Sequence, residues 1–185
     1  RVKADLLFFS TLPQLYKVYN ENDYSSLDFV FTNLLRNRKL YDQVRYLSLS
    51  GQELVRVNYN GGLPYAVQDH HLQDKKNRYY IEHTTTLQPG ELYVSPLDLN
   101  IENDQVVEPH SPVIRFIAAS TNDAGIKNGL LVLNYRGDKL IHDFRNIFSD
   151  TMCYPLLINS SNQFILSDSA GDQFTFVNKK MSTLF

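Results

Sequence analysis

Residues 41–58, YDQVRYLSLSGQELVRVN, decide the fold of this chain. Apolar and polar residues alternate in two runs, at residues 43–47 and again at residues 55–59. A period of two is typical of a strand with one buried face. The Ser-Gly-Gln sequence at residues 50–52 is a tight-turn signal, so we predict a β-hairpin.

A looser copy of this pattern lies at residues 154–168, YPLLINSSNQFILSD. One strand–turn–strand unit used twice suggests two tandem modules of one architecture, an organisation that is common in sensors. Only about two strands fit after residue 150, which is too few for an independent sheet domain. We therefore expect the second module to be very small or cut off by the chain end.

The composition allows one good hydrophobic core and a smaller second one, because 43% of the 185 residues are hydrophobic. With 18 basic and 20 acidic residues, the net charge of −2 gives no reason to expect nucleic acid or an anionic membrane as a partner. Cys153 is the single cysteine, which excludes an internal disulfide framework and a cysteine-based metal site.

No apolar run approaches the roughly 18–20 residues that a membrane span requires. No signal-peptide pattern precedes Arg1, and the chain does not begin with Met. We expect the sequence to be an excised or processed piece of a longer protein.

The first helix is indicated by Phe8, Leu12, Leu15 and Tyr19, which share one helical face. Pro13 lies inside this pattern and predicts a kink or a break.

A second helix is indicated up to Arg38, with Ser25 or Ser26 as its N-cap. Basic residues in its last turn suit the negative end of the helix dipole. Its apolar stripe consists of Leu27, Val30, Phe31, Leu34 and Leu35.

Beyond the hairpin, residues 63–90 form a long polar connection, a kind of segment that is more often functional than idle. Three more strands are expected at residues 91–97, 113–119 and 129–135. A short helix capped by Asp138 follows, with Leu140, Ile141, Phe144, Ile147 and Phe148 on its apolar face. This order predicts an α+β fold, in which a five-stranded antiparallel sheet carries helices on one face.

Four stretches of the chain resemble the extracytoplasmic double Cache sensor family, also called tandem PAS-like or PDC domains. They are LDFVFTNLLRNRKLYDQVRYLSLSGQELVRVN, NRYY at 77–80, ELYVSPLDLNIENDQVVEPHSPVIRF at 91–116 and GLLVLNYRGDKL at 129–140. Such domains occur on histidine kinases, diguanylate cyclases and chemoreceptors. The C-terminal part departs from the family pattern, because the membrane-proximal module of the family continues for several more strands.

The resemblance implies three parts: an N-terminal helical segment at 1–40, a membrane-distal PAS-like sensor module at 41–142, and a partial or minimal membrane-proximal module at 143–185. It also implies a periplasmic domain of an inner-membrane protein. The ligand pocket would lie between the central sheet and the long connection, and signals would pass as small displacements of the helices.

The sequence Arg78-Tyr79-Tyr80 lies where amino-acid-binding relatives carry an Arg-x-aromatic-aromatic motif, here in shortened form. We expect Arg78 to anchor an anionic group of a ligand by a two-pronged hydrogen bond, and Tyr80 to close over it. The alternative is a solvated arginine next to two core or lid tyrosines.

Tyr93 and Ser95 share one face of their strand and would offer two hydroxyl groups to a ligand if that face lines the pocket. A half-exposed sheet face is the alternative. Arg115 interrupts the apolar run VIRFIAA, and a buried charge requires a partner. Either a ligand anion or an internal carboxylate such as Asp98 or Glu82 would serve.

No cofactor or metal site is expected. His70 and His71 are adjacent, which points their side chains apart, and His83, His110 and His142 lack a partner at ligand spacing. Cys153 is predicted to be a small apolar core residue. The chain contains no Gly-rich phosphate loop, Gly-x-Ser-x-Gly elbow or His-Glu-x-x-His motif, which argues against an enzyme.

The leading hypothesis is a non-catalytic sensory input domain that binds a small molecule, a carboxylate or an amino acid, in its distal module. The signal would pass to a cytoplasmic kinase or diguanylate cyclase. The alternative is a module that docks a periplasmic binding protein instead of binding the ligand itself. Homodimerisation through the N-terminal helices is a further expectation, although the stripe from Phe8 to Tyr19 could equally pack on its own sheet.

Overall fold

The computed structural model of the chain describes residues 1–15, 23–59, 61–103, 105–122, 124–148, 155–159 and 164–166. The chain divides into two compact units, Arg1–Arg136 and Gly137–Phe185. Each unit is described by itself.

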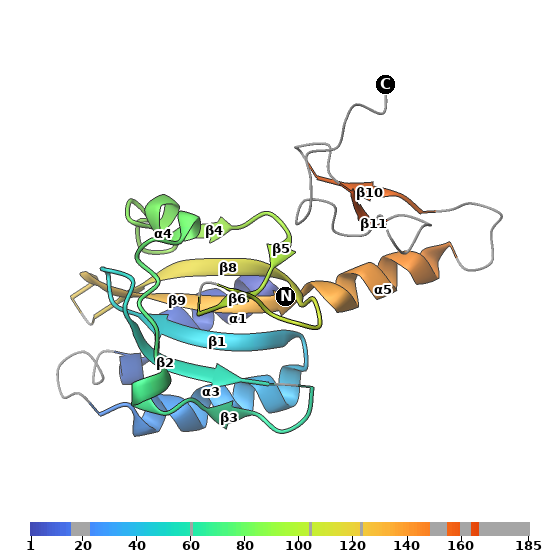
Figure 1. Cartoon of the computed structure of the whole chain (residues 1–185). Helices are drawn as coiled ribbons and strands as arrows, with labels where there is room; N and C mark the ends of the chain where they lie inside the picture. The colour runs from blue at the N-terminus through green and yellow to red at the C-terminus, as the bar shows by residue number, and fades with distance from the viewer. Residues whose placement is uncertain are drawn as a thin grey trace. The chain divides into compact units, whose positions relative to one another are not determined.

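The first unit is built on one antiparallel sheet. Its strands are β1 (Tyr41–Leu47), β2 (Glu53–Asn58), β3 (Tyr65–Ala66), β4 (Leu92–Val94), β5 (Asp98–Leu99), β8 (Pro112–Thr121) and β9 (Lys127–Arg136). They lie in the order β3-β2-β1-β9-β8-β4, and β5 also pairs with β8 (Figure 1). The five strands expected from the sequence are therefore confirmed as five neighbouring strands, in the order β2-β1-β9-β8-β4. The short β3 pairs with β2, and the short β5 pairs with β8.

The predicted hairpin is confirmed by the pairing of β1 with β2, in which Tyr46 lies opposite Val55. Its turn closes through a hydrogen bond of 3.0 Å from the Gly51 amide to the Ser48 carbonyl. Gly51 has φ of +93°, a backbone conformation that glycine adopts without steric cost. The Gly51 carbonyl also accepts a bond from the amide of Lys75, so the long connection passes directly over the turn.

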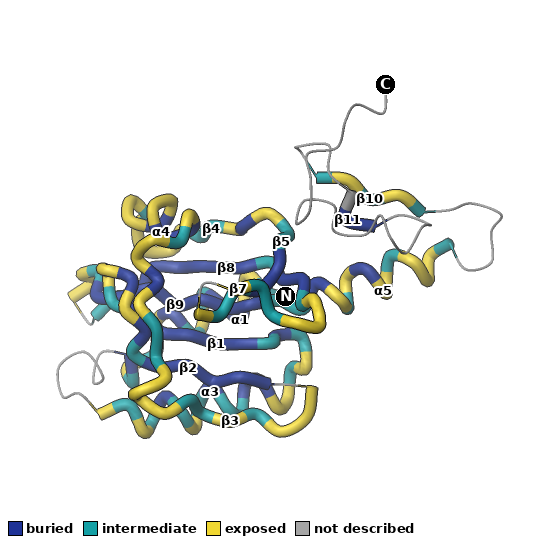
Figure 2. Tube along the Cα trace, in the orientation of Figure 1, coloured by how far each residue is buried: buried dark blue, intermediate teal, exposed yellow. Residues whose placement is uncertain are grey.

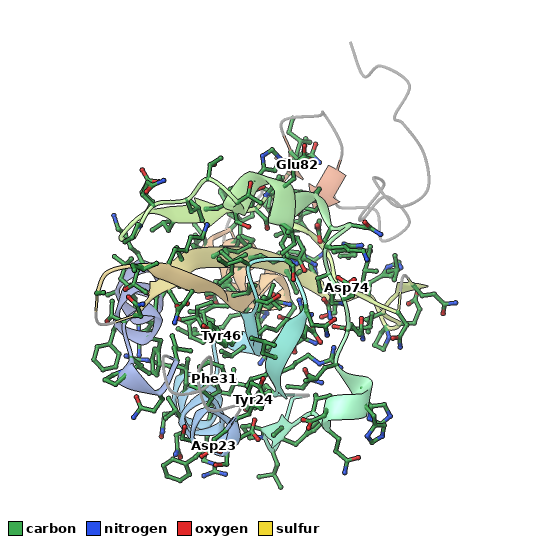
Figure 3. The ribbon with its side chains drawn as sticks, turned by 90° about the vertical axis from the view of Figure 1, so that its left-hand side faces the viewer. Asp23, Tyr24, Phe31, Tyr46, Asp74 and Glu82 are labelled. Carbon is green, nitrogen blue, oxygen red and sulfur yellow. The ribbon has the colours of Figure 1, made fainter. Side chains whose placement is uncertain are left out.

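Helices α1 (Val2–Ser10) and α3 (Ser25–Arg38) lie on one face of the sheet. Figure 3 shows Phe31 of α3 and Tyr46 of β1 between these helices and the strands, and both side chains are fully buried. The main hydrophobic core contains Leu6, Leu15, Leu27, Phe31, Leu34, Leu35, Tyr41, Val44, Tyr46, Val55, Val57, Tyr59, Ala118, Leu131 and Leu133. The alternation seen in the sequence thus places the apolar side of β1 and β2 under the helices. Figure 2 shows that both strands are buried along most of their length, so their other side is covered as well.

A buried polar contact ties α1 to the rest of the unit. The Tyr41 hydroxyl donates to one carboxylate oxygen of Asp5 at 2.7 Å, and Arg38 pairs with the other oxygen at 2.8 Å. Burial first, and then the neighbouring carboxylate, raise the pKa of Tyr41. The contact fixes α1 against the start of β1 and the end of α3.

The opposite face of the sheet is covered by the chain between β3 and β8 (Figure 1). This cover contains the short helices η1 (Asp69–His71) and α4 (Tyr79–Thr84) and the small hairpin of β6 (Ile101–Glu102) and β7 (Gln105–Val106). Between α4 and β6 the chain returns to the sheet as β4 and β5, which pair with β8.

The second unit contains helix α5 (Gly137–Ile147) and the antiparallel pair β10 (Leu157–Ile158) and β11 (Phe164–Leu166). The second hairpin expected from the sequence is thus present as a short pair. Cys153 lies outside the described residues.

Three local predictions were wrong. Helix α3 has Tyr24 at its N-cap, so neither Ser25 nor Ser26 caps it. The Ser25 amide donates a hydrogen bond to the Asp23 carboxylate. Helix α5 begins at Gly137, which places Asp138 inside its first turn. The stripe from Phe8 is not one face, because α1 ends at Ser10 and Phe8 is 63% exposed. The break expected near Pro13 accounts for this, and Leu15 lies in the core, whereas Tyr19 lies outside the described residues.

Gly129 on β9 offers a test of the packing under the helices. A Cβ atom at this position would lie 2.5 Å from the ring of the buried Tyr46. We expect Gly129→Ala to lower the free energy of unfolding by about 1–3 kcal/mol, as overpacking does in a dense core. Urea denaturation measures this cost, which should shrink in a Tyr46→Leu background. An equal cost in both backgrounds would show that the ring is not the obstacle.

Candidate functional site

The covered face of the sheet has an apolar half and a polar half. The apolar half lies over β8 and β9, where the cover contributes Tyr80 and Ile81. These side chains pack with Leu47, Ile117, Leu130 and Val132, and Tyr93 lies against this cluster. The polar half lies over β1 and β2.

The polar half is a buried ion network. Arg45 of β1 and Arg56 of β2 lie directly opposite each other, a like-charge pairing that is unfavourable unless carboxylates separate the charges. Glu53 forms an ion pair with both: one oxygen accepts from Arg56 Nη1 at 2.9 Å, and the other lies 3.2 Å from Arg45 Nε. Because burial removes water from these charges, every partner in the network affects stability.

Glu102, delivered by β6, completes the network from the cover side. One of its oxygens lies 2.9 Å from Arg45 Nη2, and the other lies 3.2 Å from Arg56 Nη1 and 3.4 Å from the ammonium of Lys75. Side-chain amides donate to the same carboxylate from Gln43, Gln73 and Asn100. A single carboxylate therefore joins two strands of the sheet to two segments of the cover, residues 73–75 and 100–102.

The network shifts the pKa values of its members. Burial would raise the pKa of Glu102, but Arg45, Lys75, the bond from Gln43 and Arg56 outweigh it and lower that pKa to about 2. Burial, followed by the charge of Arg45, lowers the pKa of Lys75. Glu102 is thus held ionised at neutral pH.

A second polar group lies beside the apolar half, around Arg115 of β8. Its guanidinium pairs with Asp98 at 2.8 Å and lies 5.1 Å from the centre of the Tyr80 ring. The Tyr79 hydroxyl donates to the other oxygen of Asp98 at 2.7 Å. Burial, followed by the charge of Asp98, raises the pKa of Tyr79. The internal salt bridge that the sequence allowed for Arg115 is confirmed, with Asp98 as the partner.

The structure brings four of the five predicted site residues together. Tyr80 is 1% exposed and fills the space under α4, with Arg115 above its ring. Ser95 donates its hydroxyl to the Pro96 carbonyl and accepts from the Arg115 amide, so its bonds are internal. Tyr93 is partly exposed and stacks on the His83 ring, with centroids 5.4 Å apart.

Arg78, the fifth predicted residue, lies at the N-cap of α4 and is partly exposed. Its side chain has no hydrogen bond or ion pair to any residue that the structure describes.

A cavity of about 590 Å³ lies at the edge of the polar half, between β2, β3 and η1. Its walls come from the long connection at residues 65–73 and from Arg56, Asn58, Glu102 and Asn103. The long connection was expected to cover a pocket beside the sheet, and its first part does line a cavity next to β2. None of the five predicted site residues lines this cavity.

The ion network is the part of the site that the sequence analysis missed. Arg45 and Arg56 interrupt apolar strands in the same way as Arg115, so the signal was available. Their partner was not, because Glu102 lies 57 residues beyond Arg45 in a segment without clear periodicity.

Residues 10–183 match the sequence family described as "Bacterial histidine kinase, sensor domain". The chain belongs to this family. No curated protein sequence matches this sensor domain.

Solved structures confirm the Cache-type fold of the sensor domain. A sensory box/GGDEF family protein domain from Vibrio parahaemolyticus superposes with a TM-score of 0.79 at 23% identity, over 94% of this chain and 65% of that one. The extracellular domain of histidine kinase vpHK1S-Z8 gives 0.77 at 22% identity, over 94% and 62%.

The ligand-binding domain of the Campylobacter jejuni chemoreceptor Tlp3, in complex with 4-methylisoleucine, gives a TM-score of 0.62 at 16% identity, over 89% of this chain and 59% of that one. The sensor domain thus spans about 59–65% of the length of these three structures.

Within the described ranges, no helix has the length and apolar character needed to cross a bilayer. No group of three or more His, Cys, Asp or Glu side chains in the described part of the chain could hold a metal ion. The rings of His70 and His71 lie 4.0 Å apart, so the expectation that these side chains point apart was wrong.

The pKa of Glu102 predicts a loss of stability in acid. A carboxylate whose pKa falls from 4.5 to about 2 on folding stabilises the folded state above pH 4.5. This contribution, about 3 kcal/mol, is lost as the pH falls from 4.5 to 2. Denaturation at several pH values should show this slope in the wild type and a smaller one in Glu102→Gln. Glu82→Gln removes an exposed carboxylate on α4 and is the control; an unchanged slope in Glu102→Gln would refute the assignment.

Proposed function

We propose that this sensor domain is the extracytoplasmic input of a bacterial transmembrane receptor. It binds a small molecule at the covered face of the sheet and passes the signal through its helices to a cytoplasmic kinase or diguanylate cyclase. The domain itself is non-catalytic in this proposal. Membership of the histidine kinase sensor family supports the receptor role.

The arrangement of Arg115, Asp98 and Tyr79 carries the choice of binding site. Asp98 is 23% exposed, and its carboxylate is oriented by Arg115 on one oxygen and by Tyr79 on the other. A carboxylate fixed in this way is ready to accept from a ligand ammonium group. Arg78, directly before Tyr79, adds a partly exposed guanidinium for a ligand carboxylate.

Aromatic rings border this site and suit the apolar part of a ligand. Tyr93 stacks on His83 beside the cluster that contains Tyr80. A cation, an anchored carboxylate and rings together fit an amino acid, and a simple carboxylate fits the arginine alone. The similar Tlp3 domain of Campylobacter jejuni has been solved with isoleucine and with L-valine bound, which supports the same class for this domain.

The mechanism of signalling follows from population shift. A ligand that prefers one arrangement of the cover over the sheet increases the fraction of that arrangement. A coupling of roughly 1–3 kcal/mol is typical of such linkage.

A thermal-stability screen of amino acids and small carboxylates tests the proposal. A ligand at a hundredfold excess over its dissociation constant adds about 2.7 kcal/mol to the stability of the folded state. We expect Arg78→Ala to weaken binding of an identified ligand at least tenfold, because it removes the carboxylate anchor. Lys76→Ala, which removes an exposed neighbouring cation, should leave binding unchanged. Undiminished binding in Arg78→Ala would remove this arginine from the site.

One observation favours the docking alternative. Tyr80 fills the interior under α4, where a bound metabolite would need space. A module that binds a partner protein on its surface does not need this space. This second function would be supported if no compound in the screen stabilised the domain and the domain captured a periplasmic binding protein.

We also propose that the domain forms a homodimer through its N-terminal helices. A groove of about 540 Å³ between α1 and α3 carries Phe8, 63% exposed, and Phe29, 72% exposed. Apolar rings side by side on a surface mark interaction sites. A second copy of this helix pair supplies the matching apolar surface.

Analytical ultracentrifugation tests the dimer. The wild type should show a concentration-dependent dimer, and the variant Phe8→Ser/Phe29→Ser should sediment as a monomer. The control Leu63→Ser alters an exposed apolar side chain away from the groove and should still dimerise. A monomeric wild type at high concentration would exclude the proposal for the isolated domain.

A further inference from the structure

The cover of the sheet has two parts that are held in different ways. Residues 73–75 and 100–102 are tied to β1 and β2 through the ion network around Glu102. Residues 76–91, all of which the structure describes, belong to no strand and carry helix α4 (Figure 1). Strand pairing resumes only at Leu92 of β4. The segment with α4 is therefore fixed to the sheet at its two ends and not by strand pairing along its length.

Helix α4 is too short to be stable by itself. It has six residues, whereas isolated helices of fewer than about 12–15 residues are marginal in water. No side-chain hydrogen bond caps its N-terminus. Its position depends on the packing of Tyr80 and Ile81 on the apolar cluster over β8 and β9. A short segment that buries few side chains is of the kind that opens locally while the rest of a domain stays folded.

Two polar contacts hold the ends of α4. The ammonium of Lys127 donates to the carbonyl oxygens of Thr84 and Thr85 at 3.0 and 2.9 Å. The last carbonyls of a helix lack partners within it, so a lysine is a favourable group at this end. At the other end, the Tyr79 hydroxyl donates to Asp98 at 2.7 Å. Both contacts reach the surface, because Tyr79 is 38% exposed and Lys127 is half-buried.

Helix α4 covers a buried arginine of the sheet. Arg115 of β8 is 1% exposed, and its guanidinium lies 5.1 Å from the centre of the Tyr80 ring. Arg56 of β2 is also buried, but it belongs to the network around Glu102 at the other half of this face. Withdrawal of α4 would therefore expose Arg115 and leave Arg56 in its present contacts.

We infer that α4 is a lid, latched by Lys127 and Tyr79, which opens without the rest of the cover and exposes Arg115. Opening withdraws the Tyr80 ring from the guanidinium, while the network around Glu102 keeps the other part of the cover in place. A ligand that binds only the open arrangement increases its population. This use of the lid rests on the proposed ligand site, whereas the opening itself is measured without any ligand.

Native-state hydrogen exchange on the purified domain measures the opening. The Ile81 amide, which is bonded to the Arg78 carbonyl, should exchange through a local opening with a weak urea dependence. The amide of Val132 in β9, a strand paired on both sides, should exchange at least tenfold more slowly and with the strong urea dependence of global unfolding. Equal rates and equal urea dependence at the two amides would overturn the lid.

Two conservative variants test the latches. Lys127→Met removes the ammonium and Tyr79→Phe removes the hydroxyl, and each keeps most of its side chain. Each should speed exchange of the Ile81 amide at least threefold relative to that of Val132. Lys3→Met, which removes an exposed lysine of α1, should leave this ratio unchanged. An unchanged ratio in Lys127→Met would overturn the latch.

Labelling with phenylglyoxal, which modifies solvent-accessible arginine side chains, tests the exposure of Arg115. Its rate of modification should rise at least threefold in Lys127→Met, whereas the rate at Arg56 should stay unchanged. An equal rise at both arginines would show general destabilisation and overturn a selective lid. A ligand screen without a hit would leave these results standing, so failure of the lid is distinguishable from failure of the proposed function.

Discussion

The carboxylate of Glu102 is the contact on which the covered face of this sensor domain depends. Three cationic side chains and three side-chain amides converge on it, from β1, from β2 and from the chain that crosses the sheet. A hydrophobic contact would hold the cover without specifying its register. Charged hydrogen bonds have narrow geometry, so they fix one position of the cover over the strands.

The two faces of the sheet differ in the kind of contact that covers them. Under α1 and α3, close packing of apolar side chains supplies the stability of the unit. On the other face, polar groups replace part of the core, which lowers the hydrophobic contribution to stability but adds charged contacts between the sheet and its cover. This division is typical of binding proteins, in which a rigid scaffold supports a more variable surface.

The sequence alone was sufficient for five of the seven strands of the sheet and insufficient for the site. The alternation around Val44 and Val55 predicted the hairpin, because two runs of period two that are joined by a turn signal indicate two paired strands. The two-residue strands β3 and β5 were missed, since they are too short for any periodicity. Arg115 could be predicted to need a carboxylate, and Asp98 was among the candidates. Glu102 could not be paired with Arg45 or Arg56, because only the folded cover brings it to them.

The hairpin turn at Gly51 is constrained from two directions. Its φ of +93° lies beyond the left-handed region of about +50 to +70° that asparagine tolerates, so it favours glycine. A Cβ atom there would also lie 2.9 Å from the backbone of Lys76 in the chain that passes over the turn. An L-amino acid with a side chain at position 51 would therefore strain the turn and displace the backbone that crosses it. The backbone at Lys76, 25 residues further along the chain, thus restricts which residue can occupy position 51 of the first hairpin.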